Sequence, residues 1–202
     1  MNVKRHINTT FLTEMGLLIA LILLLAFTPL GYIKTLGLEI TLIVVPVAVG
    51  AVLLGPSAGA LLGFIFGVTS FLQCFGMSAF GAVLLGINPI GTFITCVAAR
   101  TLMGWLTRLI YQGLKKVRLK DTATYIANLC CPLLNTLFFM SCIVIFFYNT
   151  EYIQGFVQAL GATNPFMFVL LFVGVNGLIE AALCFIVGSA VSKALLHFVN
   201  KK

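Results

Sequence analysis

Long apolar runs joined by short connections constrain this chain more than any other feature of its sequence. The first run extends from about Phe11 to Thr28, and Glu14 is the one charged residue inside it. A helix crosses the hydrocarbon core of a bilayer with about 20 apolar residues. A chain of 202 residues therefore has room for roughly six crossings and for no separate soluble domain.

The composition agrees with a membrane protein. Hydrophobic residues make up 61% of the chain and charged residues 8%, a balance that leaves too little polar surface to face water. We predict one all-α integral membrane domain over residues 1–202, folded as a helical bundle. Its six transmembrane helices are expected at 11–29, 39–54, 57–75, 89–112, 122–148 and 165–196.

The positive charges predict the orientation. Basic residues gather before the first helix, in the connection near residue 118 and at the end of the chain: Lys4, Arg5, Arg108, Lys115, Lys116, Arg118, Lys120, Lys193, Lys201 and Lys202. The positive-inside rule places all of them, and so both termini, in the cytoplasm. Orientation accounts for the net charge of +7, so we expect no nucleic-acid partner.

The cysteines and histidines predict no metal site. Most of the six cysteines lie in apolar runs, where a free cysteine behaves as a small hydrophobic residue. No C-x-x-C pair is present, and His6 and His197 lie in the two tails. We expect neither a disulfide framework nor a bound metal or other cofactor.

Small residues recur at a spacing of four in two helices. Gly59, Gly63 and Gly67 lie in the stretch GPSAGALLGFIFG, and Gly16 and Ala20 repeat the pattern in the first helix. Such a stripe lets a neighbouring helix backbone approach closely. For Gly59, Gly63 and Gly67 we expect packing inside the bundle. For Gly16 and Ala20, internal packing and docking of another membrane protein are equally good interpretations.

Two connections on the outer side have apolar character. Residues 76–89 are too short and too rich in glycine to cross the membrane, and residues 152–160 have the spacing of a short interfacial helix. Both are candidates for covering a cavity. Resting at the level of the lipid headgroups explains their composition equally well.

Arg100 and Glu180 are the ionisable residues expected deep in the membrane, where a charge is costly and marks a candidate functional site. Asn176 lies four residues before Glu180 on the same helix face, and Asn135 lies on the facing side of the preceding helix. Thr92 shares a stripe with Arg100, and Asn88 lies at the outer end of that helix. We expect these three helix faces to converge on one polar pocket.

Two interpretations of this pocket remain open from the residues alone. Arg100 and Glu180 can form an internal ion pair while the asparagines bond across helices. Alternatively, a guanidinium that is not fully neutralised binds an anionic ligand from outside, because its planar fork matches a carboxylate.

Several motifs are absent from the sequence. There is no G-x-x-x-x-G-K-[ST] phosphate loop, so the chain does not hydrolyse ATP by itself. No pairing of nucleophile and base can be assembled, so we expect no enzyme and no catalytic residues. An autonomous carrier driven by protons through Glu180 and Glu14 is the alternative transport class.

The chain resembles the substrate-binding S components of the energy-coupling factor vitamin transporters of bacterial cell membranes. Gly16 and Ala20 stand where that family carries its A-x-x-x-A docking motif, with glycine in place of the first alanine. FTPLGYI at 27–33 and NPIGTFITCVAARTLMG at 88–104 resemble the pantothenate-type members. Members specific for riboflavin, folate or pyridoxine share most of these signals.

The resemblance implies a division of labour. The S component binds its vitamin near the extracellular side, and a transmembrane coupling protein with two cytoplasmic ATPases makes it topple in the bilayer to carry the ligand inward. The implied vitamin is pantothenate. Arg100 would then hold its carboxylate, and Asn135, Asn176 and Asn88 its amide and hydroxyl groups, while Gly16 and Ala20 would dock the coupling protein.

Overall fold

The computed structural model describes residues 9–28, 31–34, 39–117 and 119–199. Five helices in this part of the chain are long and apolar enough to cross a membrane: Thr9–Ala26, Pro56–Gln73, Pro89–Lys116, Thr122–Phe147 and Asn176–His197. Two shorter apolar helices, Val44–Leu54 and Pro165–Gly174, accompany them. The predicted class, a helical bundle of a membrane protein, is confirmed.

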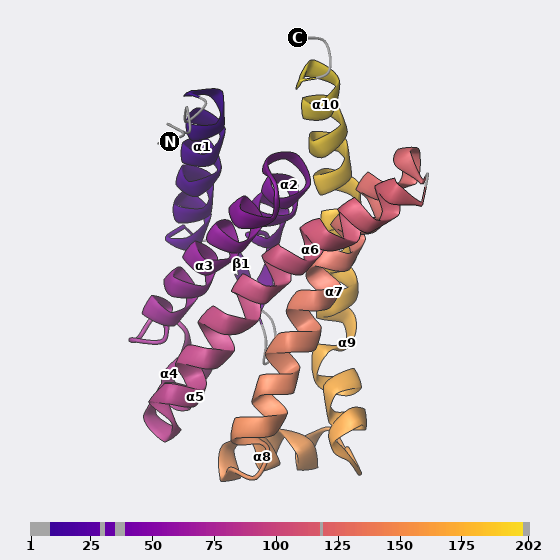
Figure 1. Ribbon diagram of the computed structural model, residues 1–202. Helices are drawn as coiled ribbons and strands as arrows, with labels where there is room; N and C mark the ends of the chain where they lie inside the picture. Colours follow the sequence, from indigo (N-terminus) through magenta and orange to yellow (C-terminus); the bar gives the residue numbers. More distant parts are fainter. Residues whose placement is uncertain (1–8, 29–30, 35–38, 118, 200–202) are drawn as a thin grey trace, which may run out of the picture.

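The elements follow one another along the chain as shown in Figure 1. They are α1 (Thr9–Ala26), β1 (Tyr32–Lys34), β2 (Glu39–Thr41), α2 (Val44–Leu54), α3 (Pro56–Gln73), α4 (Ala79–Ile87), α5 (Pro89–Phe93), η1 (Ile94–Ala98), α6 (Ala99–Lys116), α7 (Lys120–Phe147), α8 (Glu151–Ala159), α9 (Pro165–Leu183), η2 (Cys184–Gly188) and α10 (Ser189–Val199). The π-helical turns η1 and η2 join α5 to α6 and α9 to α10 without a break. Inside α9, Gly174 has φ 35° and ψ −121°, which kinks that helix.

The expected helix over 39–54 is the main departure from the predicted elements. Residues Glu39–Thr41 form β2, which pairs antiparallel with β1, and α2 begins only at Val44. Pro46 disfavours helical geometry in the residue before it and lies in the first turn of α2, so the helix starts close to this proline. With 11 residues, α2 rises about 16 Å and does not span a core of about 30 Å.

A sharp reversal connects α2 to α3. Gly55 has φ 116°, a conformation that side-chain-bearing residues rarely adopt, and Pro56 begins the next helix. The guanidinium of Arg108 on α6 donates to the Ala51 and Val52 carbonyls near the end of α2. These contacts satisfy helix-terminal carbonyls and hold α2 against α6.

The glycine stripe of α3 packs against the backbone of η1 and α6. A Cβ atom on Gly63 would overlap the Arg100 carbonyl, and one on Gly59 would overlap the Gly104 carbonyl. A Cβ on Gly67 would lie 2.7 Å from the Cα of Val97. The predicted role of these glycines in close helix packing is confirmed, and the contact fixes the height of Arg100 in the bundle.

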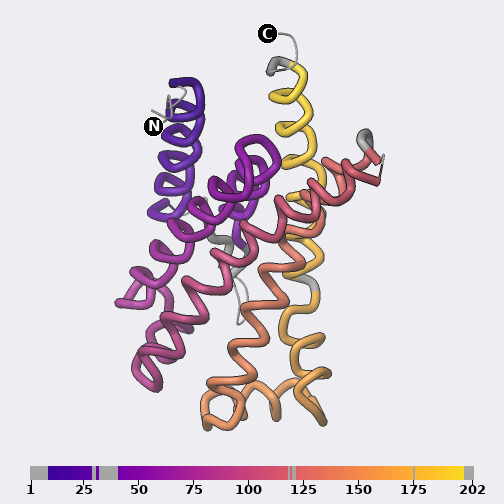
Figure 2. Tube along the Cα trace, viewed as in Figure 1, coloured from indigo at the N-terminus to yellow at the C-terminus, as the bar shows by residue number. Residues whose placement is uncertain are grey.

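The two ends of the bundle differ in charge. Figures 1 and 2 show the start of α1, the end of α10 and the junction of α6 with α7 at one end, whereas α5 and α8 lie at the other. Lys115 and Lys116 occupy the last turn of α6 at the first of these ends. By the positive-inside rule we expect that end in the cytoplasm, and we therefore refer to the end with α4, α5 and α8 as the outer side.

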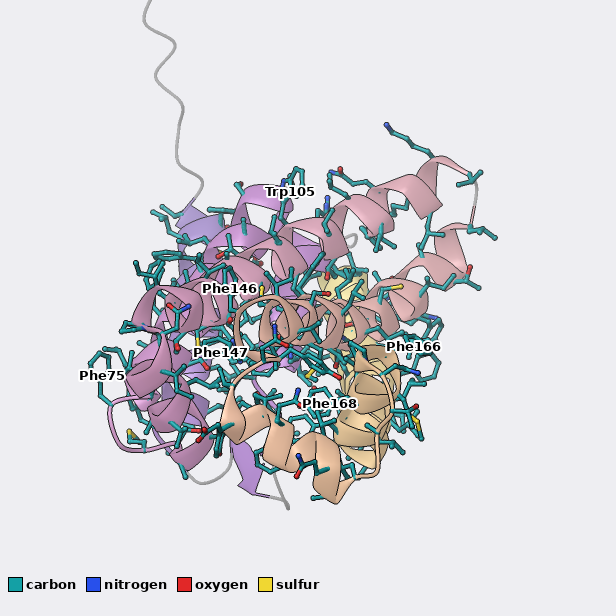
Figure 3. All side chains as sticks on the ribbon, turned by 90° about the horizontal axis from the view of Figure 1, so that it is seen from below. Phe75, Trp105, Phe146, Phe147, Phe166 and Phe168 are labelled. Carbon is teal, nitrogen blue, oxygen red and sulfur yellow. The ribbon has the colours of Figure 1, made fainter. Side chains whose placement is uncertain are left out.

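Large apolar side chains face outward around the bundle. Viewed from the outer end, Phe75 and Phe166 project from opposite edges, whereas Phe168 lies inside, near α8 (Figure 3). Phe75 is 68% exposed and Phe166 73%, and Phe168 is fully buried. In water such exposure would be unfavourable, but lipid acyl chains cover it in a membrane.

The substitution Gly63→Ala tests the packing of α3 on α6. The added methyl group would overlap the Arg100 carbonyl, so the helices must separate, at a cost of about 1–3 kcal/mol. We expect a lower Tm in detergent. Gly113→Ala on α6 is the matched control, because its Cβ would meet nothing within 4 Å, and its Tm should not fall. Equal Tm values for the two variants would contradict the packing.

Candidate functional site

A cavity of about 420 Å³ lies in the outer part of the bundle. Helices α3, α7 and α9 and the continuous α5–η1–α6 helix surround it, and residues of α4 and α8 line its outer end. Its volume lies in the range of about 300–1,000 Å³ that is usual for small-molecule sites. The polar residues on its wall are Thr41, Ser70, Gln73, Ser78, Thr92, Thr95, Arg100, Asn135, Thr136, Asn176 and Glu180.

Arg100 is held by the π-helical turn that precedes it. One terminal guanidinium nitrogen of Arg100 donates to the Cys96 carbonyl at 3.1 Å and to the Thr95 carbonyl at 3.5 Å. At this turn the Ala99 N–H bonds the carbonyl of Ile94, five residues back, so the backbone ladder is shifted from α-helical geometry. The shifted carbonyls orient the guanidinium toward the cavity.

Two aromatic rings flank the same guanidinium. The Cζ atom of Arg100 lies 4.6 Å from the ring centroid of Phe66 and 5.4 Å from that of Phe139. These distances are typical of cation–π contacts. Arg100 is only 7% exposed, and its Nε atom is buried without a hydrogen-bond partner among the described residues. The guanidinium thus retains one buried donor that no described residue satisfies.

Glu180 does not form an ion pair with Arg100. Its Oε1 atom accepts a hydrogen bond from the backbone N–H of Thr41 at 2.7 Å. Within the described ranges, no carboxylate oxygen lies within the 4.0 Å that defines an ion pair with Arg100. The sequence left open whether Arg100 and Glu180 form an internal ion pair. The structure does not contain this pair.

Three further predicted residues line the cavity. Asn135 is 7% exposed, and its Oδ1 atom is buried with no partner in the described chain. Asn176 and Thr92 are also on the wall. The Thr92 hydroxyl donates to the Asn88 carbonyl at 2.9 Å. Facing helices thus bring neutral polar groups into the space that Arg100 shares with Glu180.

Asn88 has a different place from the one predicted. Its side-chain oxygen accepts a hydrogen bond from the Gly91 N–H at 2.9 Å and caps the start of α5. It is not among the cavity-lining residues. The pattern Asn-Pro at a helix start is typical of a cap followed by proline at the first helical position, and this explains the residue without a ligand.

Gln73 and Thr41 are cavity residues that the sequence interpretation missed. The Gln73 side chain donates to the Ala26 carbonyl at the end of α1, and the Thr41 N–H bonds Glu180. The connection between α1 and α2 is therefore fixed to the cavity wall near both of its ends. Gln73 was recognisable as a buried amide at the outer end of an apolar helix, whereas Thr41 carried no signal.

Aromatic side chains gather where α4 and α8 cover the cavity. The ring of Phe80 lies 5.9 Å from Tyr152 and 6.3 Å from Phe156, measured between centroids, and all three residues line the cavity. The ring of Phe172 on α9 lies 5.2 Å from Phe156. The outer connections singled out in the sequence thus form part of the cavity wall.

Gly16 and Ala20 lie on an exposed part of α1. A Cβ atom on Gly16 would meet nothing within 4 Å, so packing inside the subunit does not require glycine there. Gly16 also borders a surface groove between α1 and the start of α3, lined by Phe11, Leu12, Met15, Ile19, Ser57, Ala58 and Leu61. This surface is open to a membrane partner.

The hydrogen bond between Thr41 and Glu180 is testable by substitution. Glu180→Ala removes the acceptor, and a hydrogen bond to a charged group contributes about 1.5–3 kcal/mol. We expect amide hydrogen exchange in a peptide covering β2 to accelerate about tenfold or more. Glu180→Gln keeps an oxygen acceptor and should show a smaller increase. Unchanged exchange in the alanine variant would exclude Glu180 as the anchor of this strand.

The comparison with protein families agrees with this geometry. A family model described as "ECF transporter, substrate-specific component" matches residues 10–192, which include all the cavity-lining residues. A comparison with individual curated proteins gave no match. The matched family is that of a transporter subunit and not of an enzyme. The chain belongs to the substrate-specific components of the energy-coupling factor (ECF) transporters.

Proposed function

We propose that this subunit binds a vitamin carrying a carboxylate, pantothenate, in the cavity beneath α4 and α8. The observation that carries the proposal is a buried guanidinium, Arg100, on the wall of a cavity of about 420 Å³ with no carboxylate of the described chain within ion-pair distance. The vitamin enters from the extracellular side.

The electrostatics favour an anion over a neutral ligand. A buried cation loses the solvation of water, and backbone carbonyls and aromatic rings replace only part of it. A ligand carboxylate adds a full opposite charge and accepts charge-assisted hydrogen bonds from the guanidinium. The low local dielectric strengthens this attraction.

Pantothenate suits the rest of the wall. It has one carboxylate, together with an amide and hydroxyl groups that are neutral. Asn135 and Asn176 offer side-chain amides at the cavity, and Thr92 contributes a further polar group. Glu180 has a second carboxylate oxygen that can accept from a ligand hydroxyl. The resemblance of residues 27–33 and 88–104 to pantothenate-type S components supports the same choice.

The steps after binding, which are energy supply and transport across the membrane, require partner proteins. Since the chain has no nucleotide-binding loop, the energy for uptake comes from elsewhere. In our proposal the exposed face of α1 around Gly16 and Ala20 docks a transmembrane coupling protein that works with two cytoplasmic ATPases. Toppling of the loaded subunit then carries pantothenate to the cytoplasmic side of the cell membrane.

Isothermal titration of the purified chain against a vitamin panel tests the ligand. We expect pantothenate to bind the parent protein, and Arg100→Ala to bind it about 100-fold more weakly, because the charge-assisted bonds are lost. Arg100→Lys keeps the charge but lacks the planar fork, so its affinity should be intermediate. Lys116→Ala, at the exposed end of α6, should leave binding unchanged.

Two results of the titration would count against the proposal. Tight binding of another vitamin without binding of pantothenate would refute the ligand. Equal pantothenate affinity in the parent and in Arg100→Ala would refute the role of the guanidinium.

Docking through α1 has its own test. Trp in place of Gly16 or Ala20 should prevent copurification with the coupling protein and ATPases, because a bulky side chain keeps the helices apart. Pantothenate binding should persist. Leu21→Trp is the matched control, since Leu21 is 40% exposed on another face of α1, and it should copurify normally. Intact complexes with Gly16→Trp and Ala20→Trp would remove the docking role from this stripe.

A further inference from the structure

Two thiols lie next to each other on the wall of the cavity. The Sγ atoms of Cys74, which follows α3, and of Cys96, in η1, are 3.9 Å apart. The two residues are 22 positions apart in the sequence and belong to different parts of the bundle. Both border the cavity that also contains Arg100.

The environment of this pair differs from that of the other cysteines. Cys74 is 4% and Cys96 5% exposed, and both are part of the cavity wall. Cys130, Cys131, Cys142 and Cys184 are not among the cavity-lining residues. A small reagent that enters the cavity therefore meets Cys74 and Cys96 before any other thiol.

We propose that Cys74 and Cys96 are a redox-active pair that a hydroperoxide oxidises to a reversible disulfide inside the ligand site. One sulfur attacks a peroxide oxygen, the O–O bond breaks, and a sulfenic acid and water are formed. The second thiol then attacks the sulfenic sulfur. The S–S bond forms, the S–O bond breaks, and a second water leaves. Two thiols and one hydrogen peroxide thus give one disulfide and two waters.

The local structure can accommodate the bond. The sulfurs must approach from 3.9 Å to about 2.05 Å, which requires a small movement of each residue. Cys74 has left the regular part of α3, and Gly76 with φ 125° turns the chain two residues later. This end of α3 can therefore follow the bond more easily than a residue inside a helix.

Oxidation would alter the site itself. The carbonyl of Cys96 accepts the hydrogen bond that orients Arg100, so a displacement of Cys96 also displaces the guanidinium. The disulfide also joins α3 to η1 on one wall of the cavity. This consequence rests on the proposed function, whereas formation of the bond does not.

Hydrogen peroxide titration of the purified protein, followed by thiol counting and peptide mass mapping, tests the pair. We expect two of the six thiols to disappear, a cross-linked peptide that joins Cys74 to Cys96, and full recovery after treatment with a reductant. In Cys74→Ser and in Cys96→Ser that peptide cannot form, and the remaining thiol should be oxidised without a partner. Cys142→Ser is the matched control and should still form the disulfide.

The results of these experiments test the redox pair separately from the proposed binding of pantothenate. The absence of the cross-linked peptide in the parent protein, or a disulfide between other cysteines, would overturn the redox pair even if pantothenate binds. If the peptide forms, we expect the oxidised protein to bind pantothenate about tenfold more weakly than the reduced protein. Equal affinities of the two forms would overturn the control of the site by oxidation. Failure of pantothenate to bind the reduced protein would instead count against the proposed ligand.

Discussion

The structure depends on the burial of one positive charge that no internal carboxylate neutralises at ion-pair distance within the described chain. Arg100 is held by the carbonyls of a π-helical turn and by the rings of Phe66 and Phe139. These contacts compensate part of the lost hydration and leave the charge itself available. Glu180 serves a different purpose, because it anchors the backbone of Thr41. Because Arg100 and Glu180 do not pair with each other, both side chains border the open cavity.

Helix packing and helix distortion together place this charge. The glycine stripe lets α3 touch the backbone of α6, and Gly63 lies against Arg100 itself. A side chain at that position would overlap the Arg100 carbonyl and push α3 and α6 apart. The π-helical turn η1 supplies those carbonyls. Membrane helices have no hydrophobic effect to drive their association, so such close backbone contacts are what hold the bundle together.

Much of the helical fold and most of the polar cavity residues could be predicted from the sequence, for physical reasons that are specific to membranes. A charge in an apolar helix is costly, which singled out Arg100 and Glu180, and helical periodicity placed Asn135, Asn176 and Thr92 on converging faces. Asn88 caps α5 and is not on the cavity wall, and the sequence could not separate the two roles because a capping asparagine and a ligand-binding one look alike. The strand at 39–41 was missed because it directly precedes the apolar run of α2, and only its pairing with β1 shows that these residues are not helical. The bond from Thr41 to Glu180 joins residues 139 positions apart, and no local pattern predicts it.

The most direct test is an experimental structure of the protein with pantothenate bound. We predict that the ligand carboxylate lies within hydrogen-bond distance of the Arg100 guanidinium, which still contacts the carbonyls of η1, and that Asn135 and Asn176 face the neutral part of the ligand. A carboxylate placed away from Arg100, or an Arg100 paired with Glu180 while the ligand is bound elsewhere, would contradict the central claim.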